Sequence, residues 1–252
     1  MTVLFNLGVL IIEFALIAAL AGLAFALPLF FCCATSALVV VVGLSLEWAR
    51  LSHDAPFFYD DASKSRRVLI AATGSLETFV KAIAAGVAGM LTFLGNDDQR
   101  QLVVIVVFAV CIFAGTGFLR RGYYSLGIRP MRWGYFRLSI PLGILFSILL
   151  QATIQFGLVE VKTLGELART VVFDLPERPD VAAVSDLAFN VKQLLDAFVV
   201  DVIDRLVGPT WAAVAGVFVS VNVLLGFAIA IHAVVISEVI LRLEQQRQAG
   251  NG

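Results

Sequence analysis

The sequence predicts an all-α fold: a polytopic transmembrane helical bundle of about six spans with one extracytoplasmic amphipathic helical segment. Three observations predict it: a long apolar run at the start of the chain, a composition poor in charge, and a helical periodicity late in the chain. Of the 252 residues, 60% are hydrophobic and 15% are charged, and the mean hydropathy is +0.94. Soluble domains carry about 25% charged and about 45–50% apolar residues. The composition therefore indicates a membrane protein whose loops hold most of the charge.

The apolar run covers residues 3–46 and contains a single formal charge, Glu13. One helix of about 44 residues would measure about 66 Å, twice the roughly 30 Å of the hydrocarbon core. Pro28 lies near the middle, where a helical hairpin can turn. We therefore expect residues 1–47 to form an N-terminal transmembrane hairpin. One span followed by a re-entrant segment is the alternative, and it would leave five spans.

Polar segments divide the rest of the chain. Residues 48–67 are predicted as a cytoplasmic loop. Residues 68–159 hold spans three to five, with a basic and aromatic cytoplasmic loop at 120–137 between the fourth and fifth. Residues 210–252 contain the last span and a polar tail.

The distribution of basic residues predicts the orientation. Lysine and arginine gather in the segments 48–67 and 120–137 and in the tail, whereas the turn at 95–101 has only Arg100 beside two aspartates. Short cytoplasmic loops carry an excess of Lys and Arg. We therefore expect a multi-pass protein of a cell (cytoplasmic or inner) membrane, with its C-terminus in the cytoplasm.

This orientation places residues 160–209 outside the cytoplasm, and their second half has a helical period. Apolar residues recur three or four apart, so they share one face of a helix that Gly208 and Pro209 end. A helix that binds anionic lipid by charge would be basic, but this one has only two bases, Lys192 and Arg205. We therefore predict a protein interface, formed by Val184, Leu187, Val191, Leu194, Phe198 and Val202, with Leu206 continuing the same face.

Four ionisable residues fall inside predicted spans: Glu13, Glu77, Lys81 and His232. A charged side chain there costs at least about 2.5–3.5 kcal/mol on insertion scales. Glu77 and Lys81 are four residues apart, which favours an ion pair within one helix. Glu13 has no partner in its own helix, so it is either a structural acid or a cation or proton site. For His232 we expect a hydrogen-bonded packing role.

The basic loop offers a candidate lipid head-group site at Arg120, Arg121, Arg129 and Arg132, with aromatic residues beside them. Simple topological anchoring is the alternative.

Small residues recur at intervals of four, at Ala82 and Gly86, at Ala85 and Gly89, and around Gly22. This spacing predicts close helix packing.

Sequence signatures of enzymes are missing. There is no Walker loop, no GxSxG, no HExxH and no dinucleotide-binding fingerprint. The three cysteines, Cys32, Cys33 and Cys111, lie in apolar runs without metal-ligand spacing. We therefore predict no catalytic residue, no metal and no cofactor. The net charge of −1 argues against nucleic acid as a partner.

Two functional hypotheses follow. The first is a non-enzymatic subunit or scaffold of a membrane protein assembly, whose partners are the lipid bilayer and other membrane-protein subunits or a second copy of the chain. The second is a transporter or channel subunit with a polar path through Glu13, Glu77, Lys81 and His232.

Overall fold

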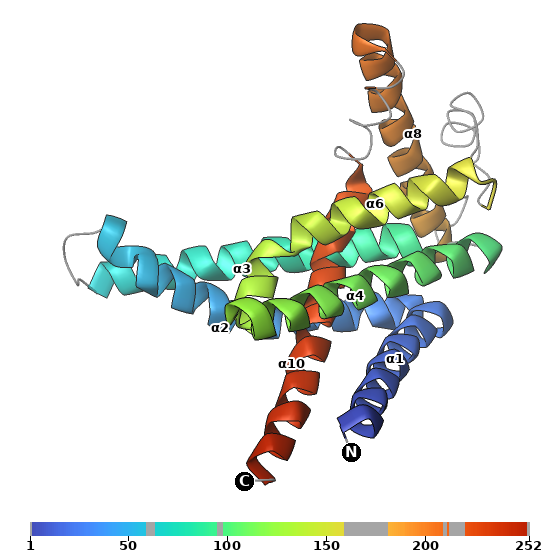
Figure 1. Ribbon diagram of the computed structural model, residues 1–252. Coiled ribbons are helices and arrows are strands. Elements are labelled where there is room, and N and C mark those ends of the chain that lie inside the picture. The colour runs from blue at the N-terminus through green and yellow to red at the C-terminus, as the bar shows by residue number, and fades with distance from the viewer. Residues whose placement is uncertain are drawn as a thin grey trace.

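Helices make up the secondary structure of the described chain (Figure 1). The computed structural model describes residues 2–58, 64–94, 98–158, 181–208, 211 and 220–250. Within these ranges no strand occurs, so the predicted all-α class is confirmed. Five of the described helices are long and apolar enough to cross a membrane, and a bent helix pair would make a sixth. The elements are α1 (Thr2–Ala26), α2 (Pro28–Phe58), α3 (Lys64–Phe93), α4 (Asp98–Leu126), η1 (Pro130–Gly134), α5 (Tyr135–Arg137), α6 (Ser139–Gln155), α8 (Val181–Val207), η2 (Val221–Leu225) and α10 (Gly226–Gly250).

The apolar opening run folds as two helices, α1 and α2, that meet at Leu27. Pro28 occupies the first position of α2, where its missing N–H and fixed φ suit a helix start. Each of the two helices is long enough to span a membrane on its own. Two helices of spanning length thus lie where the hairpin is predicted, and the transmembrane hairpin itself stays a prediction.

The helices continue beyond the apolar runs that reveal them. α2 ends at Phe58, about a dozen residues after the hydrophobic run, and α3 already begins at Lys64. In the basic segment, α4 continues to Leu126, and Gly127 with φ +66 then turns the chain. Hydropathy marks the part of a helix that lies in hydrocarbon and not its ends, so most of the predicted loop residues 120–137 are helical.

The predicted fifth span is a bent pair. η1 and α5 precede α6, and the axis turns by 60° between them, at Leu138. The 17 residues of α6 would cover about 26 Å, which is short of the roughly 30 Å hydrocarbon core. If the bent pair is one span, the helical turns that precede Leu138 supply its remaining length.

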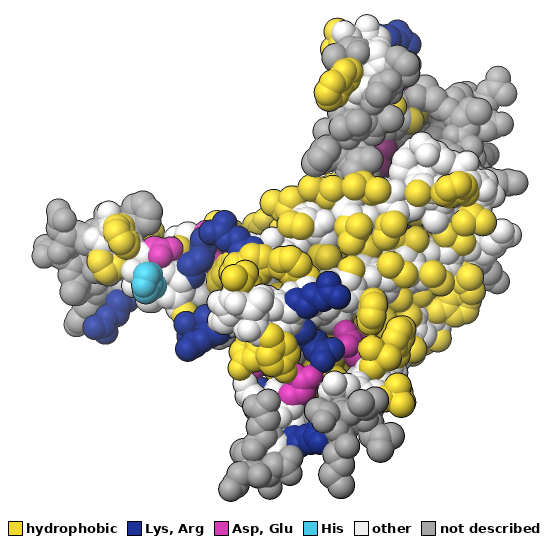
Figure 2. Space-filling model, in the orientation of Figure 1, with side chains coloured by type: hydrophobic (Ala, Val, Ile, Leu, Met, Phe, Trp, Pro, Cys, Tyr) yellow, Lys and Arg dark blue, Asp and Glu magenta, His cyan; other side chains and the backbone are white. Residues whose placement is uncertain are grey.

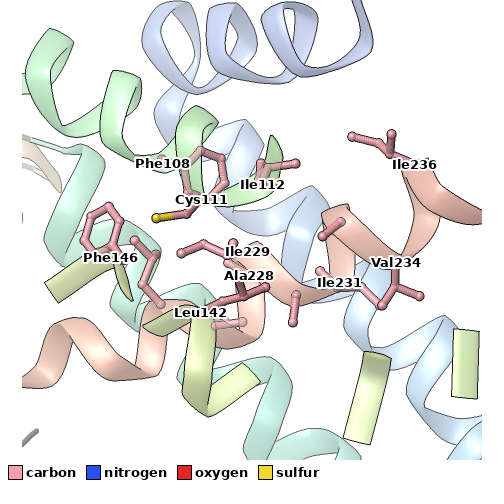
Figure 3. Packing of buried hydrophobic residues seen from close by; sticks show 14 of the residues in the cluster. Phe108, Cys111, Ile112, Leu142, Phe146, Ala228, Ile229, Ile231, Val234 and Ile236 are labelled. Atoms are coloured by element: carbon pink, nitrogen blue, oxygen red, sulfur yellow. The ribbon is translucent and has the colours of Figure 1, made fainter. Parts of the chain in front are cut away.

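α10 is the central helix, and Figure 1 shows it crossing α4 and α6 steeply. Most residues from Leu225 to Leu241 are buried, and Val239 is the exposed one among them. Figure 3 shows its side chains meeting those of α4 and α6 in one core. A helix that is apolar on all sides is suited to such a position. The labelled core residues are Phe108, Cys111 and Ile112 of α4, Leu142 and Phe146 of α6, and Ala228, Ile229, Ile231, Val234 and Ile236 of α10.

Two glycines let the main chains touch where α6 meets the start of α10. A Cβ on Gly226 would lie 1.8 Å from the carbonyl oxygen of Ser139, and a Cβ on Gly143 would lie 2.1 Å from that of Val223. Real carbon atoms do not approach oxygens so closely, so only glycine fits at these two positions.

Small residues also bring α2 and α3 together. A Cβ on Gly86 would lie 2.3 Å from Ser36 Oγ, and one on Gly89 would lie 3.0 Å from Cys32 Sγ. Ala82 and Ala85 are buried. The predicted close packing is confirmed here, but it is wrong for Gly22, where an added Cβ meets nothing within 4 Å.

The outer surface of the bundle is apolar. On α3 many large residues point outward while Ala82, Ala85 and Ala88 are buried, the reverse of the arrangement in a soluble helix. Figure 2 shows hydrophobic side chains covering the middle and right of the displayed face, with Lys and Arg to their left and below. Such a continuous apolar exterior is suited to lipid and not to water. The exposed residues of α3 include Leu76, Phe79, Val80, Ile83 and Val87.

α8 confirms the helix predicted from the late periodicity. It ends where Gly208 adopts φ +93 and donates its N–H to the carbonyl of Asp204 at 2.9 Å. Asp196 accepts a hydrogen bond of 3.0 Å from Ser220 Oγ, which ties the helix to the chain before α10. In Figure 1 part of the helix extends away from the bundle, and the helix also packs against α3. The expected features of residues 160–180 lie outside the described residues.

Candidate functional site

The four predicted intramembrane polar residues lie in three clusters that share no member. Glu13 belongs to a cluster with Arg120 and Glu244. Glu77 and Lys81 belong to a cluster with a second acid and a second base. His232 pairs with a threonine. These separate pairings decide what the polar residues can do.

The first group, which we call the three-helix charge cluster, comprises Glu13 of α1, Arg120 of α4 and Glu244 of α10. Arg120 Nη1 lies 2.9 Å from Glu13 Oε2, and its Nη2 lies 2.8 Å from Glu244 Oε1. Thr116 Oγ1 donates to Glu13 Oε1 at 2.5 Å, and Tyr124 donates to Glu244. A single guanidinium thus joins three helices, which its planar set of N–H donors permits.

The Glu13 side chain is 2% exposed, so its charge depends on these partners. An unpaired carboxylate at this depth would be strongly unfavourable. The sequence left Glu13 without a partner and placed Arg120 among the candidate head-group residues. Arg120 instead directs its guanidinium inward between two carboxylates. Two signals were available in the sequence: Glu13 is an isolated acid within one predicted span, and arginines follow directly after another. These signals did not show whether Arg120 or Arg121 is the partner of Glu13.

The second group, which we call the four-charge cluster, joins α2 to α3. Arg50 contacts Glu47 at 2.9 Å and Glu77 at 2.5 Å, and Lys81 donates to Glu47. Lys81 and Glu77, the pair predicted from their spacing, are 4.0 Å apart. The predicted ion pair is therefore present, but as the weakest contact in a network of two acids and two bases.

Glu47 is the member that sequence reasoning missed, and its side chain is fully buried. The rings of Tyr135 and Phe136 lie beside its partner Lys81, whose Nζ is 5.2 Å from the centre of the first ring and 5.6 Å from that of the second. These are cation–π distances. The available signal was the spacing of three residues between Glu47 and Arg50 at the end of the second predicted span, which permits an ion pair within one helix.

The two members of the predicted pair should differ in importance. Lys81→Met leaves the fully buried Glu47 with Arg50, which Glu77 also contacts, as its cation among the described residues. The loss should therefore be smaller than the roughly 3–5 kcal/mol of a buried ion pair that is broken outright. Glu77→Gln removes a half-exposed carboxylate, for which about 0.2–1 kcal/mol is expected. In the double variant Arg50 no longer has to neutralise Glu77 as well as Glu47, so much of the stability should return. Thermal unfolding in detergent measures the stability of all three variants. Equal losses of stability in the two single variants would contradict this arrangement of the four charges.

His232 packs against aromatic rings at the centre of the bundle. Its Nε2 lies 3.0 Å from Thr35 Oγ1 of α2, and its ring stacks on Phe31 at 5.3 Å. In the described ranges no group of three His, Cys, Asp or Glu residues is placed to hold a metal ion. The geometry is that of the hydrogen-bonded packing residue expected from the sequence.

A pocket of about 320 Å³ lies between the end of α4, the start of η1 and the last turns of α10. Two of the four candidate head-group arginines, Arg129 and Arg132, line it, whereas Arg120 and Arg121 do not. Arg242 of α10 joins them from a distant part of the sequence. The other lining residues are Leu46, Tyr123, Pro130, Met131, Glu238, Leu241 and Gln245.

No protein-family model, no curated protein and no solved structure matches this chain. The fold itself defines the class, a helical membrane protein whose described residues form five to six helices long and apolar enough to span the bilayer. Beyond this class, function has to be argued from the side chains described above.

Proposed function

We propose that this protein is a non-enzymatic subunit of a membrane protein assembly and that α8 docks a neighbouring subunit. The observation that carries the proposal is the exposure of the predicted apolar face of α8. Phe198 is 58% exposed and Leu206 is 77% exposed, and Val191 and Val202 are also exposed. The intramolecular contact described above instead uses Asp196, on another face of the helix. Leu187 and Leu194 of the same face are half-buried, so the face is open at only part of its length. Large apolar side chains exposed on one face of a helix are typical of an interaction surface.

The charge of α8 supports a protein partner over a lipid surface. The helix contains Asp186, Asp196, Asp201 and Asp204 against the bases Lys192 and Arg205. Arg205 is itself paired with Asp201 at 2.8 Å. Helices that lie on anionic membranes carry an excess of Lys and Arg, so an acidic helix with an apolar face is better suited to another protein.

The transporter alternative requires polar groups that exchange partners along a path. The four residues instead lie in three separate clusters, Glu13 in one, Glu77 and Lys81 in a second, and His232 in a third. This separation favours the subunit proposal. Ion flux or dissipation of a pH gradient can be measured in proteoliposomes. Robust flux in the wild type that disappears in a well-folded Glu13→Gln variant would favour the transporter.

Charge placed on the apolar face should remove the partner. Phe198→Asp or Leu194→Asp puts a carboxylate into the proposed interface, where an unpaired charge is costly to bury. We expect the amount of partner, or of second copy, that copurifies in mild detergent to fall at least about tenfold, a change of 1.4 kcal/mol. Gln193→Asp is the matched control, because it adds the same charge on another face of the helix. Equal behaviour of Phe198→Asp and the control would reject the docking role.

The proposed orientation has both basic segments and the C-terminus in the cytoplasm of a cell membrane, with α8 outside. Its support is the asymmetry of Lys and Arg. Single cysteines at Asp97 and Ser125 in a cysteine-free background distinguish the two sides. An impermeant thiol reagent should label position 97 in intact cells and spare position 125, and the reverse pattern would overturn the orientation.

A further inference from the structure

We infer that the pocket between α4, η1 and α10 binds the phosphate group of an anionic lipid. Its lining residues come from α2, α4, η1, α10 and the connection before η1, and three of these residues are arginines: Arg129, Arg132 and Arg242. The inference does not depend on the docking role of α8, which lies elsewhere in the fold.

The charge of the pocket is suited to an anion. Three arginines face one acid, Glu238, which leaves two positive charges in excess. Arg242 uses its Nε for Glu238 at 3.3 Å, so that acid is already paired. Arg129 and Arg132 form no ion pair with any described residue, and both are exposed. Arginine is suited to phosphate because its N–H groups match two oxygens at once.

A neutral donor adds to the basic groups. Gln245 Nε2 donates to the hydroxyl oxygen of Tyr123 at 2.9 Å. That contact orients the hydroxyl and leaves its own hydrogen available to donate to an anion. The pocket can therefore offer both charged and uncharged hydrogen bonds.

The rest of the lining is apolar, which favours a lipid as the source of the phosphate. Leu46, Met131 and Leu241 supply hydrocarbon contacts that inorganic phosphate cannot use. Leu241 ends the apolar part of α10 and Arg242 follows it directly, so the pocket lies where hydrocarbon gives way to polar surroundings. Basic pockets between transmembrane helices on the cytoplasmic side are a recognised form of head-group site. The volume is at the lower end of ligand pockets, about 300–1,000 Å³.

The test uses the full-length protein in a neutral detergent. The probes are short-chain phosphatidylglycerol, short-chain phosphatidylcholine and inorganic phosphate, each titrated against the thermal unfolding temperature. The variant Arg129→Gln/Arg132→Gln removes two arginines of the pocket. The control Arg121→Gln/Arg137→Gln removes two exposed arginines of the same segment that do not line it.

Phosphatidylglycerol should raise the unfolding temperature of the wild type and of the control. It should bind the pocket variant at least about tenfold more weakly. Phosphatidylcholine should have little effect on any of the three proteins. Inorganic phosphate that binds as tightly as the lipid, and is lost in the same variant, would confirm an anion site but overturn the lipid as its source. Equal binding to the pocket and control variants, or no binding of either anion to the wild type, would overturn the site itself.

Discussion

Replacing Gly226 by alanine is expected to leave little folded protein. The added methyl group would lie 1.8 Å from the carbonyl oxygen of Ser139 and 2.7 Å from the amide nitrogen of Gly143. Both neighbours are main-chain atoms, so no rotamer change can make room, and α6 must move away from α10. Overpacking a core usually costs about 1–3 kcal/mol, and more where the backbone has to shift.

Gly117→Ala is the matched control, because this glycine also lies in a long apolar helix but has nothing within 4 Å of an added Cβ. Size-exclusion chromatography of a fluorescent fusion measures folded yield for both variants. We expect Gly226→Ala to shift largely to aggregate and Gly117→Ala to elute as the wild type does. A monodisperse Gly226→Ala variant of wild-type stability would show that the helices do not meet through their main chains.

The second large effect is expected at Arg120. Arg120→Met removes the only cation in contact with Glu13 among the described residues and leaves a buried carboxylate beside Thr116 alone. Removing one partner of a buried pair costs about 3–5 kcal/mol. Glu13→Gln should cost less, because Arg120 retains Glu244 at 2.8 Å. The double variant should regain part of the loss, since Glu13 no longer needs a cation.

Unfolding in detergent, followed for the two single variants and the double variant, gives the coupling energy between Glu13 and Arg120. Contacting residues typically couple by about 0.5–3 kcal/mol. Arg121→Met is the control, because it removes the neighbouring arginine, whose side chain is exposed. The charge cluster would be contradicted by additive effects of the two single changes or by an Arg120→Met variant as stable as the control.

The sequence predicted the parts of the fold that depend on local pattern. The length of the apolar run predicted the two helices around Pro28, and apolar residues spaced three or four apart predicted α8 and its end at Gly208. Both predictions are possible because a helix face and a glycine turn depend on residues that are close in sequence. It could not predict that α10 is central. Every span is apolar on most sides, so hydropathy does not separate a helix that faces lipid from one that faces other helices.

The polar clusters were predictable only where both partners share a helix. Glu77 and Lys81 could be paired from their spacing, whereas Arg120 with Glu13 and Lys81 with Glu47 are joined by helix packing. The same holds for the pocket. Arg129 and Arg132 are close in sequence, but Arg242 reaches them only because α10 ends beside the turn after α4.

The central claim, that the exposed face of α8 docks another protein, is tested most directly by photo-crosslinking in intact membranes. A photoreactive residue at Phe198 lies on that face, and one at Asp204 is exposed on another face of the same helix. The account predicts a discrete protein adduct from position 198, of a mass that identifies either a second copy or a different subunit, and no such adduct from position 204. Adducts to lipid alone at position 198, or the same protein adduct from both positions, would contradict it.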